Sequence, residues 1–183
     1  MVRLKDFTDF LHTLAPLYLA EDYDNVGLLV ESEKSEIESV LISLDADNSV
    51  VKEALKNGCD MVLCHHPLIF TPLKKIEKTS PVFSLVKNNI ALYAMHTNFD
   101  AVQGGLCDAL LKRICNFKEV FPLDGEEDNA LGRIAVLKEK VRLSEFAKSI
   151  KDALGLDALR IVGSLDKEIE TVANCNGGGA DFL

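Results

Sequence analysis

The chain has 183 residues, of which 48% are hydrophobic and 27% charged, a composition typical of a globular protein with a sizeable core rather than of a disordered chain. Lys and Arg total 20 while Asp and Glu total 29, so the formal net charge is −9. An acidic surface disfavours a nucleic-acid backbone or an anionic membrane as the main partner.

The cysteines and the N-terminus indicate the compartment. Five cysteines form neither a CxxC pair nor an even set, at positions 59, 64, 107, 115 and 175. This pattern is typical of reduced thiols rather than of a disulfide framework. The first residues are amphipathic and include an acid, unlike a signal peptide, and no apolar run is long enough to span a bilayer. We therefore expect a cytoplasmic protein with no membrane contact.

The first two thirds of the chain alternate between predicted strands and helices. Apolar residues recur at helical spacing from Leu4 to Leu14 and predict an amphipathic helix over residues 3–15, which ends before Pro16. Three strand-then-helix units follow, with strands over 40–44, 61–64 and 90–95 and helices over 50–56, 82–87 and 106–113. Parallel strands need such crossover helices, so this order predicts a mostly parallel sheet.

A polar stretch rich in turn-forming residues at Pro122–Asn129 predicts a linker. We expect an N-terminal α/β lobe over 1–121, the linker over 122–129 and a second lobe over 130–183. The second lobe should hold strands over 133–137, 159–162 and 169–175 and a helix over 144–154. The predicted class is α/β, with mostly parallel or mixed sheets flanked by helices in two similar lobes. A glycine-rich turn lies just before Leu183, so we expect the second lobe to be cut short.

Three of the four histidines and one carboxylate follow two neighbouring predicted strands, in Cys64-His65-His66-Pro67 and His96-Thr97-Asn98-Phe99-Asp100. Functional groups gather beyond the carboxyl ends of parallel strands, so these residues should converge at one sheet edge. Imidazole together with carboxylate suits Zn, Mn, Fe or Ni rather than Ca alone. The pattern therefore predicts a metal site, where adjacent histidines can serve adjacent ions.

Simpler interpretations stand beside these. One of the paired histidines can cap a strand while the other faces solvent, and Asp100 can cap the turn that follows it. Cys64 should face away from His65 as a thiol of the core. Asp24 and Asn25 precede an apolar run, so they can belong either to a substrate-facing loop or to a turn that enters a strand.

Four motifs together resemble one family: Asp24-Asn25-Val26-Gly27-Leu28, His65-His66-Pro67, His96-Thr97-Asn98-Phe99-Asp100 and Gly177-Gly178-Gly179. They are similar, in type and order, to those of the NGG-one-interacting factor three family, whose bacterial members are named GTP cyclohydrolase 1 type 2 homologues. The resemblance implies an α/β fold, two divalent ions per subunit (Zn, Fe, Mn or Ni) and a toroidal homohexamer built from trimers.

The resemblance also implies roles for single residues. His65 and His66 would each bind one of two ions, and Asp100 would bind the ion held by His65. His96 would lie beside the centre as a weaker ligand or as a catalytic proton-transfer group. The family completes its site with a late His-x-x-x-Glu pair, but no histidine follows His96 here. We therefore expect this chain to carry part of a di-metal site. Asp24 and Asn25 would lie near the substrate cleft and bind substrate.

The resemblance thus favours a di-metal-dependent, GTP cyclohydrolase-like hydrolase that uses a metal-activated water on a purine nucleotide or a related small molecule. The alternative is a metal-binding or regulatory protein-interaction factor without turnover. Ser or Cys nucleophile motifs such as GxSxG are absent from the sequence.

Overall fold

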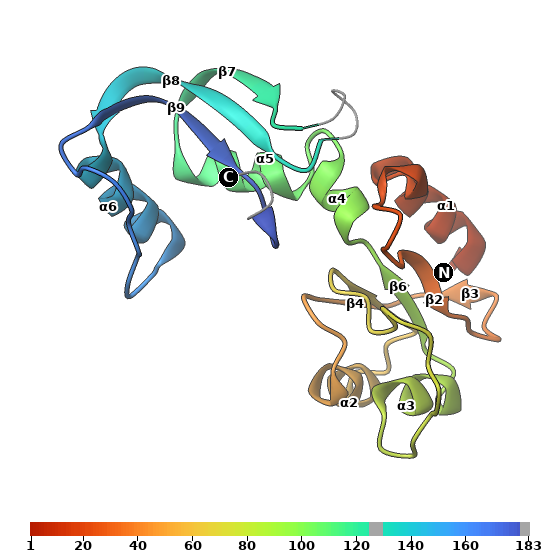
Figure 1. Cartoon of the computed structure of the whole chain (residues 1–183). Helices are drawn as coiled ribbons and strands as arrows, with labels where there is room; N and C mark the ends of the chain where they lie inside the picture. The colour runs from red at the N-terminus through yellow and green to blue at the C-terminus, as the bar shows by residue number, and fades with distance from the viewer. Residues whose placement is uncertain (125–129, 180–183) are drawn as a thin grey trace. The chain divides into compact units, whose positions relative to one another are not determined.

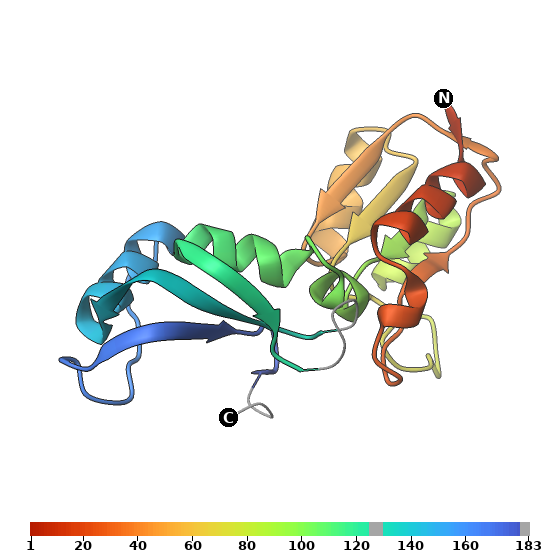
Figure 2. The same ribbon diagram turned by 90° about the horizontal axis from the view of Figure 1, so that it is seen from above.

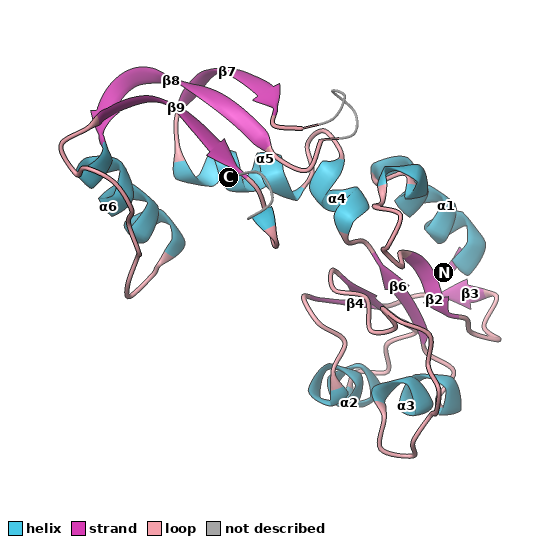
Figure 3. Cartoon of the chain, in the orientation of Figure 1, coloured by secondary structure: helices cyan, strands magenta, loops and turns pink. Residues whose placement is uncertain are grey.

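The computed structural model describes residues 1–124 and 130–179. The chain divides into two compact units, Met1–Phe99 and Asp100–Leu183, whose helices and strands are labelled in Figure 1 and coloured by type in Figure 3. Within the described ranges, no helix has the length and apolar character that a membrane crossing requires.

The first unit is built on a four-stranded sheet with the order β2-β6-β5-β4. Strands β4, β5 and β6 run parallel, whereas β2 pairs antiparallel with β6 at one edge. A short antiparallel pair, β1 with β3, lies outside this sheet. The strand bounds are β1 Val2–Arg3, β2 Gly27–Val30, β3 Glu36–Ile37, β4 Val40–Ser43, β5 Met61–Cys64 and β6 Ala91–Ala94.

Helices cover both faces of this sheet, with α2 and α3 on one face and α1 on the other (Figure 1 and Figure 2). Every residue of β6 is buried because this strand is central and covered on both sides. The cluster on the α2 and α3 face includes Val51, Val62, Leu85 and Leu92. The bounds are α1 Leu4–Leu14, a 3₁₀ turn Leu17–Leu19, α2 Asn48–Lys56 and α3 Pro81–Lys87.

Local signals explain where these helices begin. The Asp47 carboxylate accepts hydrogen bonds from the backbone N–H groups of Ser49 and Val50 at the start of α2. The Ser80 hydroxyl accepts from the N–H of Phe83, and Pro81 occupies the first turn of α3. These are the caps that satisfy the unpaired N–H groups of a helix start. Each crossover helix therefore begins at a defined residue, which fixes the path into the next strand.

The second unit has an antiparallel three-stranded sheet with the order β7-β8-β9. Helices α5 and α6 pack against it, and a hydrophobic cluster of Leu137, Phe146 and Val172 lies between α6 and the sheet. The chain enters this unit through a short helix. The bounds are α4 Thr97–Ala101, α5 Leu106–Ile114, β7 Phe117–Pro122, β8 Arg133–Arg142, α6 Leu143–Leu154 and β9 Glu168–Asn174.

A buried arginine joins the elements of the second unit. Arg133 is 4% exposed, and its guanidinium donates to both carboxylate oxygens of Asp108, at 2.8 and 3.2 Å. It also donates to the backbone carbonyls of Ala130 and Gly132 on one side and of Ala101 on the other. A buried charge is tolerated only when it is paired and hydrogen-bonded in this way. Arg133 therefore ties β8 to α5 and to the end of α4.

The observed elements confirm the predicted α/β class and the parallel arrangement of β4, β5 and β6. The strand predicted over 159–162 is wrong: this stretch forms no strand, and Val162 is 92% exposed. All four of its residues are exposed, so the stretch has no buried face that would hold it as a strand.

The division into units falls at Phe99, earlier than the linker predicted over 122–129. The reason is that β7, which ends at Pro122, pairs with β8 across that stretch. Part of the predicted linker, 125–129, lies outside the described residues.

Candidate metal centre

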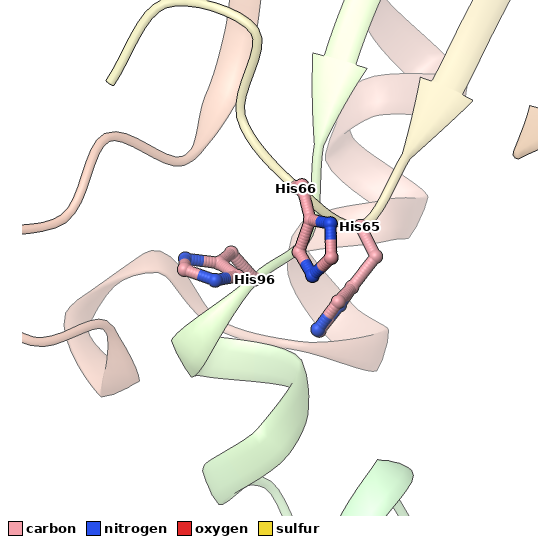
Figure 4. Close-up of side chains that lie close together, drawn as sticks. All are labelled: His65, His66 and His96. Atoms are coloured by element: carbon pink, nitrogen blue, oxygen red, sulfur yellow. The ribbon is translucent and has the colours of Figure 1, made fainter. Parts of the chain in front are cut away.

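The three histidines singled out in the sequence lie together at the carboxyl ends of β5 and β6 (Figure 4). His65 and His66 directly follow β5, and His96 follows β6 after one residue. The ring centroids are 5.1 Å apart for His65 and His66, 5.1 Å for His65 and His96, and 5.8 Å for His66 and His96. The expected convergence at one sheet edge is therefore present.

The backbone after β5 explains how adjacent histidines reach the same place. Consecutive side chains of a regular strand point to opposite faces. Here the pairing with β4 changes after Cys64, because the N–H groups of both His65 and His66 lie within hydrogen-bond distance of the Leu44 carbonyl. The strand ends at this point, and both imidazoles turn toward His96.

Each imidazole is held through its Nδ1 atom by a different acceptor. Nδ1 of His65 lies 2.8 Å from the Met95 carbonyl oxygen. Nδ1 of His66 lies 2.8 Å from Oδ1 of Asp45, and Nδ1 of His96 lies 2.9 Å from Oδ1 of the third acceptor, Asp24. A carbonyl or a carboxylate can only accept, so Nδ1 carries the proton in each ring. The lone pair of each neutral ring is consequently on Nε2, the position that a metal ligand uses.

Asp24 is the most constrained of these acceptors. Its side chain is fully buried, and it accepts from the backbone N–H groups of Asn25 and Thr97 and from the Thr97 hydroxyl as well as from His96. Burial alone would raise the pKa of Asp24, but the hydrogen bonds from Thr97 and His96 outweigh it and hold the pKa below its ordinary value. Asp24 therefore remains ionised beside His96 at neutral pH.

The donor set fits a transition-metal ion. One nitrogen from each of the three imidazoles lies within 4.8 Å of the others, a set that small rotations can bring onto an ion with bonds of about 2.0–2.1 Å. Imidazole suits Zn, Fe, Ni and Cu. Carboxylate or carbonyl anchors on the second ring nitrogen are the usual support of metal-binding histidines. The residues present thus have the chemistry of a metal site with its supporting hydrogen bonds.

The remaining predicted site residues lie in different surroundings. Asn25 donates through its side-chain amide to the Ile69 carbonyl, so it joins two loops beside the histidines. Asp100 is the first residue of the second unit and is 7% exposed. Its carboxylate accepts from the Asn176 amide at 3.2 Å. The assignments of Asp100 to metal and of Asp24 and Asn25 to substrate stay predictions.

Sequence reasoning singled out Asp24 but did not identify two other supporting residues, Asp45 and Asn98. Asp45 follows β4 at the same sheet edge as the histidines, and this position is the signal that could have revealed it. Asn98 is fully buried, accepts from the N–H of His96 at 3.0 Å and donates to the Ala15 carbonyl at 2.8 Å. It ties the turn after β6 to the end of α1, and no spacing rule in the sequence could show that contact.

Cys64 behaves as a core thiol, as expected. It is 2% exposed, and burial raises its pKa to about 11, so it is a neutral thiol at physiological pH. Its Sγ lies 3.2 Å from the His66 carbonyl oxygen. The thiol thus points to a backbone carbonyl, and Cys64 does not belong to the group of three histidines that could hold a metal ion.

Fold and site together define a candidate metalloprotein of the α/β class, with its ligands beyond the carboxyl ends of parallel strands. The model of the Duf34/NIF3 family (NGG1p interacting factor 3) matches residues 2–183. The chain belongs to this family, and the resemblance inferred from the four motifs is confirmed.

The relatives of this chain carry two kinds of name. The GTP cyclohydrolase 1 type 2 homolog of Clostridium perfringens is 36% identical over 190 residues, which cover 100% of this chain and 72% of that protein. The NIF3-like protein 1 of Drosophila melanogaster is 34% identical over 183 residues, covering 94% of this chain and 62% of that protein.

Solved structures confirm the fold. The hypothetical protein SA1388 of Staphylococcus aureus superposes with a TM-score of 0.90 at 26% identity, covering 99% of this chain and 74% of that one. Reduced HcgD of Methanocaldococcus jannaschii superposes with a TM-score of 0.72 at 35% identity, covering 82% of this chain and 60% of that one.

Proposed function

We propose that this protein is a metal-dependent hydrolase of the GTP cyclohydrolase type, acting on a purine nucleotide or a related small molecule. The observation that carries the proposal is the anchoring of all three imidazoles through Nδ1, which leaves Nε2 as the metal-binding nitrogen in rings that lie close together. The names of the relatives support the nucleotide as substrate.

In this proposal His65 and His66 hold divalent metal, with Asp100 as the carboxylate ligand and two ions in the complete site. A divalent ion bound there supplies an activated water near neutral pH. Zn, Fe, Mn and Ni all suit this donor set. A cytoplasmic, toroidal homohexamer is the assembly that we propose from the family resemblance.

His96 is the proposed catalytic group, because its imidazole is paired with a buried carboxylate. The side chain of Asp24 is 0% exposed and that of His96 is 22% exposed. A carboxylate that accepts from Nδ1 stabilises the protonated ring, so Nε2 of His96 can take up a proton and return it. The electrophile in this scheme is a ring carbon between two nitrogens of a purine base.

The test compares metal content and turnover in three proteins. We expect the wild type, reloaded with Zn, Mn, Fe or Ni in separate samples, to hold metal by elemental analysis and to release product from GTP. His65→Ala should lose bound metal and turnover together. His12→Gln is the matched control, since His12 is the one histidine outside the group, and it should retain both.

Two outcomes would count against the proposal. Unchanged turnover in His65→Ala would exclude the histidine group as the catalytic centre. Metal binding that depends on His65, without turnover of GTP or of other purine nucleotides with any ion, would instead favour the metal-binding or regulatory interaction factor.

A further inference from the structure

Two exposed aromatic rings lie beside the histidine group. Phe70 is 45% exposed, and its ring centroid is 6.3 Å from that of His96, at an interplanar angle of 89°. Tyr23 is 65% exposed, and its ring is 6.4 Å from that of Phe70, at 64°. In an edge-to-face contact one ring presents only its edge, so ring faces remain uncovered by these contacts. The two rings thus continue outward from the imidazole of His96.

Tyr23 is held in place by the turn that carries it. The N–H of Asp24 donates to the Glu21 carbonyl at 2.9 Å, so Tyr23 lies inside a closed four-residue turn. Both ends of the turn are bound to the same residue after β6: the N–H of Glu21 donates to the Thr97 hydroxyl at 3.0 Å, and the Asp24 carboxylate accepts from the N–H of Thr97. An exposed aromatic ring on a turn fixed at both ends is preorganised for contact.

The loop that carries Phe70 is fixed to the same turn. The Asn25 side-chain amide donates to the carbonyl of Ile69, the residue directly before Phe70. Three consecutive residues therefore link this region together: Tyr23 contacts Phe70, Asp24 holds His96, and Asn25 holds the loop. The aromatic pair and the candidate metal centre form one connected structure within the first unit.

We propose that Tyr23 and Phe70 form a stacking subsite for a planar heteroaromatic ring of the substrate. The purine form of this inference rests on the proposed function, but the subsite follows from the rings themselves. Exposed aromatic rings bind planar bases through their π-faces with little dependence on base identity. Stacking there would hold the ring of the ligand next to His96, so that its reacting carbon faces the imidazoles.

The experiment measures binding to metal-depleted protein, so that it does not depend on turnover. The probes are guanosine 5′-monophosphate and ribose 5-phosphate, followed by saturation-transfer NMR and titration calorimetry. We expect the ring protons of the nucleotide to receive saturation and the ring-free sugar phosphate to bind roughly tenfold more weakly or not at all. Tyr23→Leu and Phe70→Leu should each weaken nucleotide binding by about tenfold.

Two variants separate a stacking role from other effects. Tyr23→Phe keeps the ring and should retain wild-type affinity. Tyr18→Leu is the matched control, because Tyr18 is also exposed, at 78%. It lies in the 3₁₀ turn shortly before the four-residue turn that carries Tyr23. This variant should bind like the wild type. Thermal melting of each variant tests whether these surface changes leave the fold intact.

The proposal is overturned if the wild type does not bind the nucleotide, if ribose 5-phosphate binds equally well, or if Tyr23→Leu and Phe70→Leu bind normally. These results are distinct from failure of the proposed function. Ring binding that is lost in both variants, without turnover in metal-loaded protein, supports the subsite and contradicts the hydrolase. Turnover with an unchanged KM in both variants would support the hydrolase and contradict the stacking subsite.

Discussion

At the scale of single residues, the site depends as much on the acceptors behind the histidines as on the histidines. The two carboxylates differ in exposure, with side-chain values of 0% for Asp24 and 62% for Asp45. A buried anchor holds its imidazole more firmly than a solvated one, because water does not compete for the hydrogen bond. His96 is thus fixed more rigidly than His66, in agreement with its proposed role in proton transfer.

We expect Asp24→Asn to disturb His96 without unfolding the chain. Each oxygen of the Asp24 carboxylate accepts two hydrogen bonds, from Asn25 and His96 on one side and from the N–H and hydroxyl of Thr97 on the other. In Asp24→Asn the side-chain NH₂ replaces one of these oxygens. Whichever oxygen it replaces, it faces an N–H donor and cannot accept its hydrogen bond. The Nδ1–H form of His96 should lose its support, which nitrogen-15 NMR of the imidazole detects without metal.

Zn²⁺ affinity in Asp24→Asn should fall by about 10- to 100-fold, the usual cost of losing such an anchor. Asp47→Asn is the control, since the Asp47 carboxylate also accepts from backbone N–H groups but caps α2, and Asn caps helices about as well as Asp. An unchanged imidazole spectrum in Asp24→Asn would show that the carboxylate does not select the tautomer.

At the scale of elements, short apolar runs predicted β4, β5 and β6, most clearly the central strands β5 and β6, whose residues are almost all buried. Strand β7 was missed: most of its residues are exposed and it lies at a sheet edge, so its structure depends on pairing with β8. The prediction of a strand over 159–162 was wrong for a different reason: the run is apolar in sequence, but the structure leaves it exposed and unpaired with any strand. The histidines were predictable because they follow buried strands, whereas Asn98 acts through contacts that spacing does not reveal.

Asp60 joins elements of the first unit and should make stability depend on pH. Its carboxylate binds Lys34 at 2.6 Å and accepts from the N–H groups of Glu38 and Ser39 before β4. The hydrogen bond from Lys34, followed by that from Glu38, lowers the pKa of Asp60 from 3.8 to about 2. A lowered pKa means that this contribution is complete above about pH 4 and is lost as the pH falls toward 2.

Asp60→Asn should therefore lower the free energy of unfolding by about 1 kcal/mol at pH 6. The difference from the wild type should shrink as the pH falls to about 2. Urea unfolding across this range measures it. Asp9→Asn removes an exposed pair with Lys5 and should show little difference at any pH. A difference in the free energy of unfolding that stays constant with pH would show that the Asp60 carboxylate is not the source of the pH dependence.

At the scale of the whole molecule, each unit has its own buried cluster and its own sheet. Domains with separate cores can lose structure separately. The four motifs were enough to identify the family across the chain, but the sequence could not show that the second sheet is antiparallel throughout. Long-range pairing of that kind follows from which edges meet, and local residue patterns carry little information about it.

Arg133→Met should destabilise the second unit selectively. The substitution leaves the Asp108 carboxylate and the carbonyls of Ala101 and Ala130 without the guanidinium that they bind. Breaking a buried pair by removing one partner costs about 3–5 kcal/mol. Hydrogen exchange should increase over residues 100–124 and 130–179, while the first unit keeps its protection.

The control for this prediction is Arg113→Met. Arg113 is exposed and donates to one carbonyl, that of Ala153, so we expect a loss below about 1 kcal/mol. Equal loss of protection in both units of Arg133→Met would mean that the two unfold together, and the separate cores would not define separate cooperative blocks.

The three histidines and all their anchors lie between Asp24 and His96, inside the unit that leaves the ribosome first. At synthesis rates of about 5–20 residues per second, the residues after His96 take several seconds to follow. During that interval a nascent chain already presents a full set of imidazoles to the metal ions around it. Under the proposed function, the choice of ion can thus be made during translation, by whichever ion is then within reach, before the second sheet has formed.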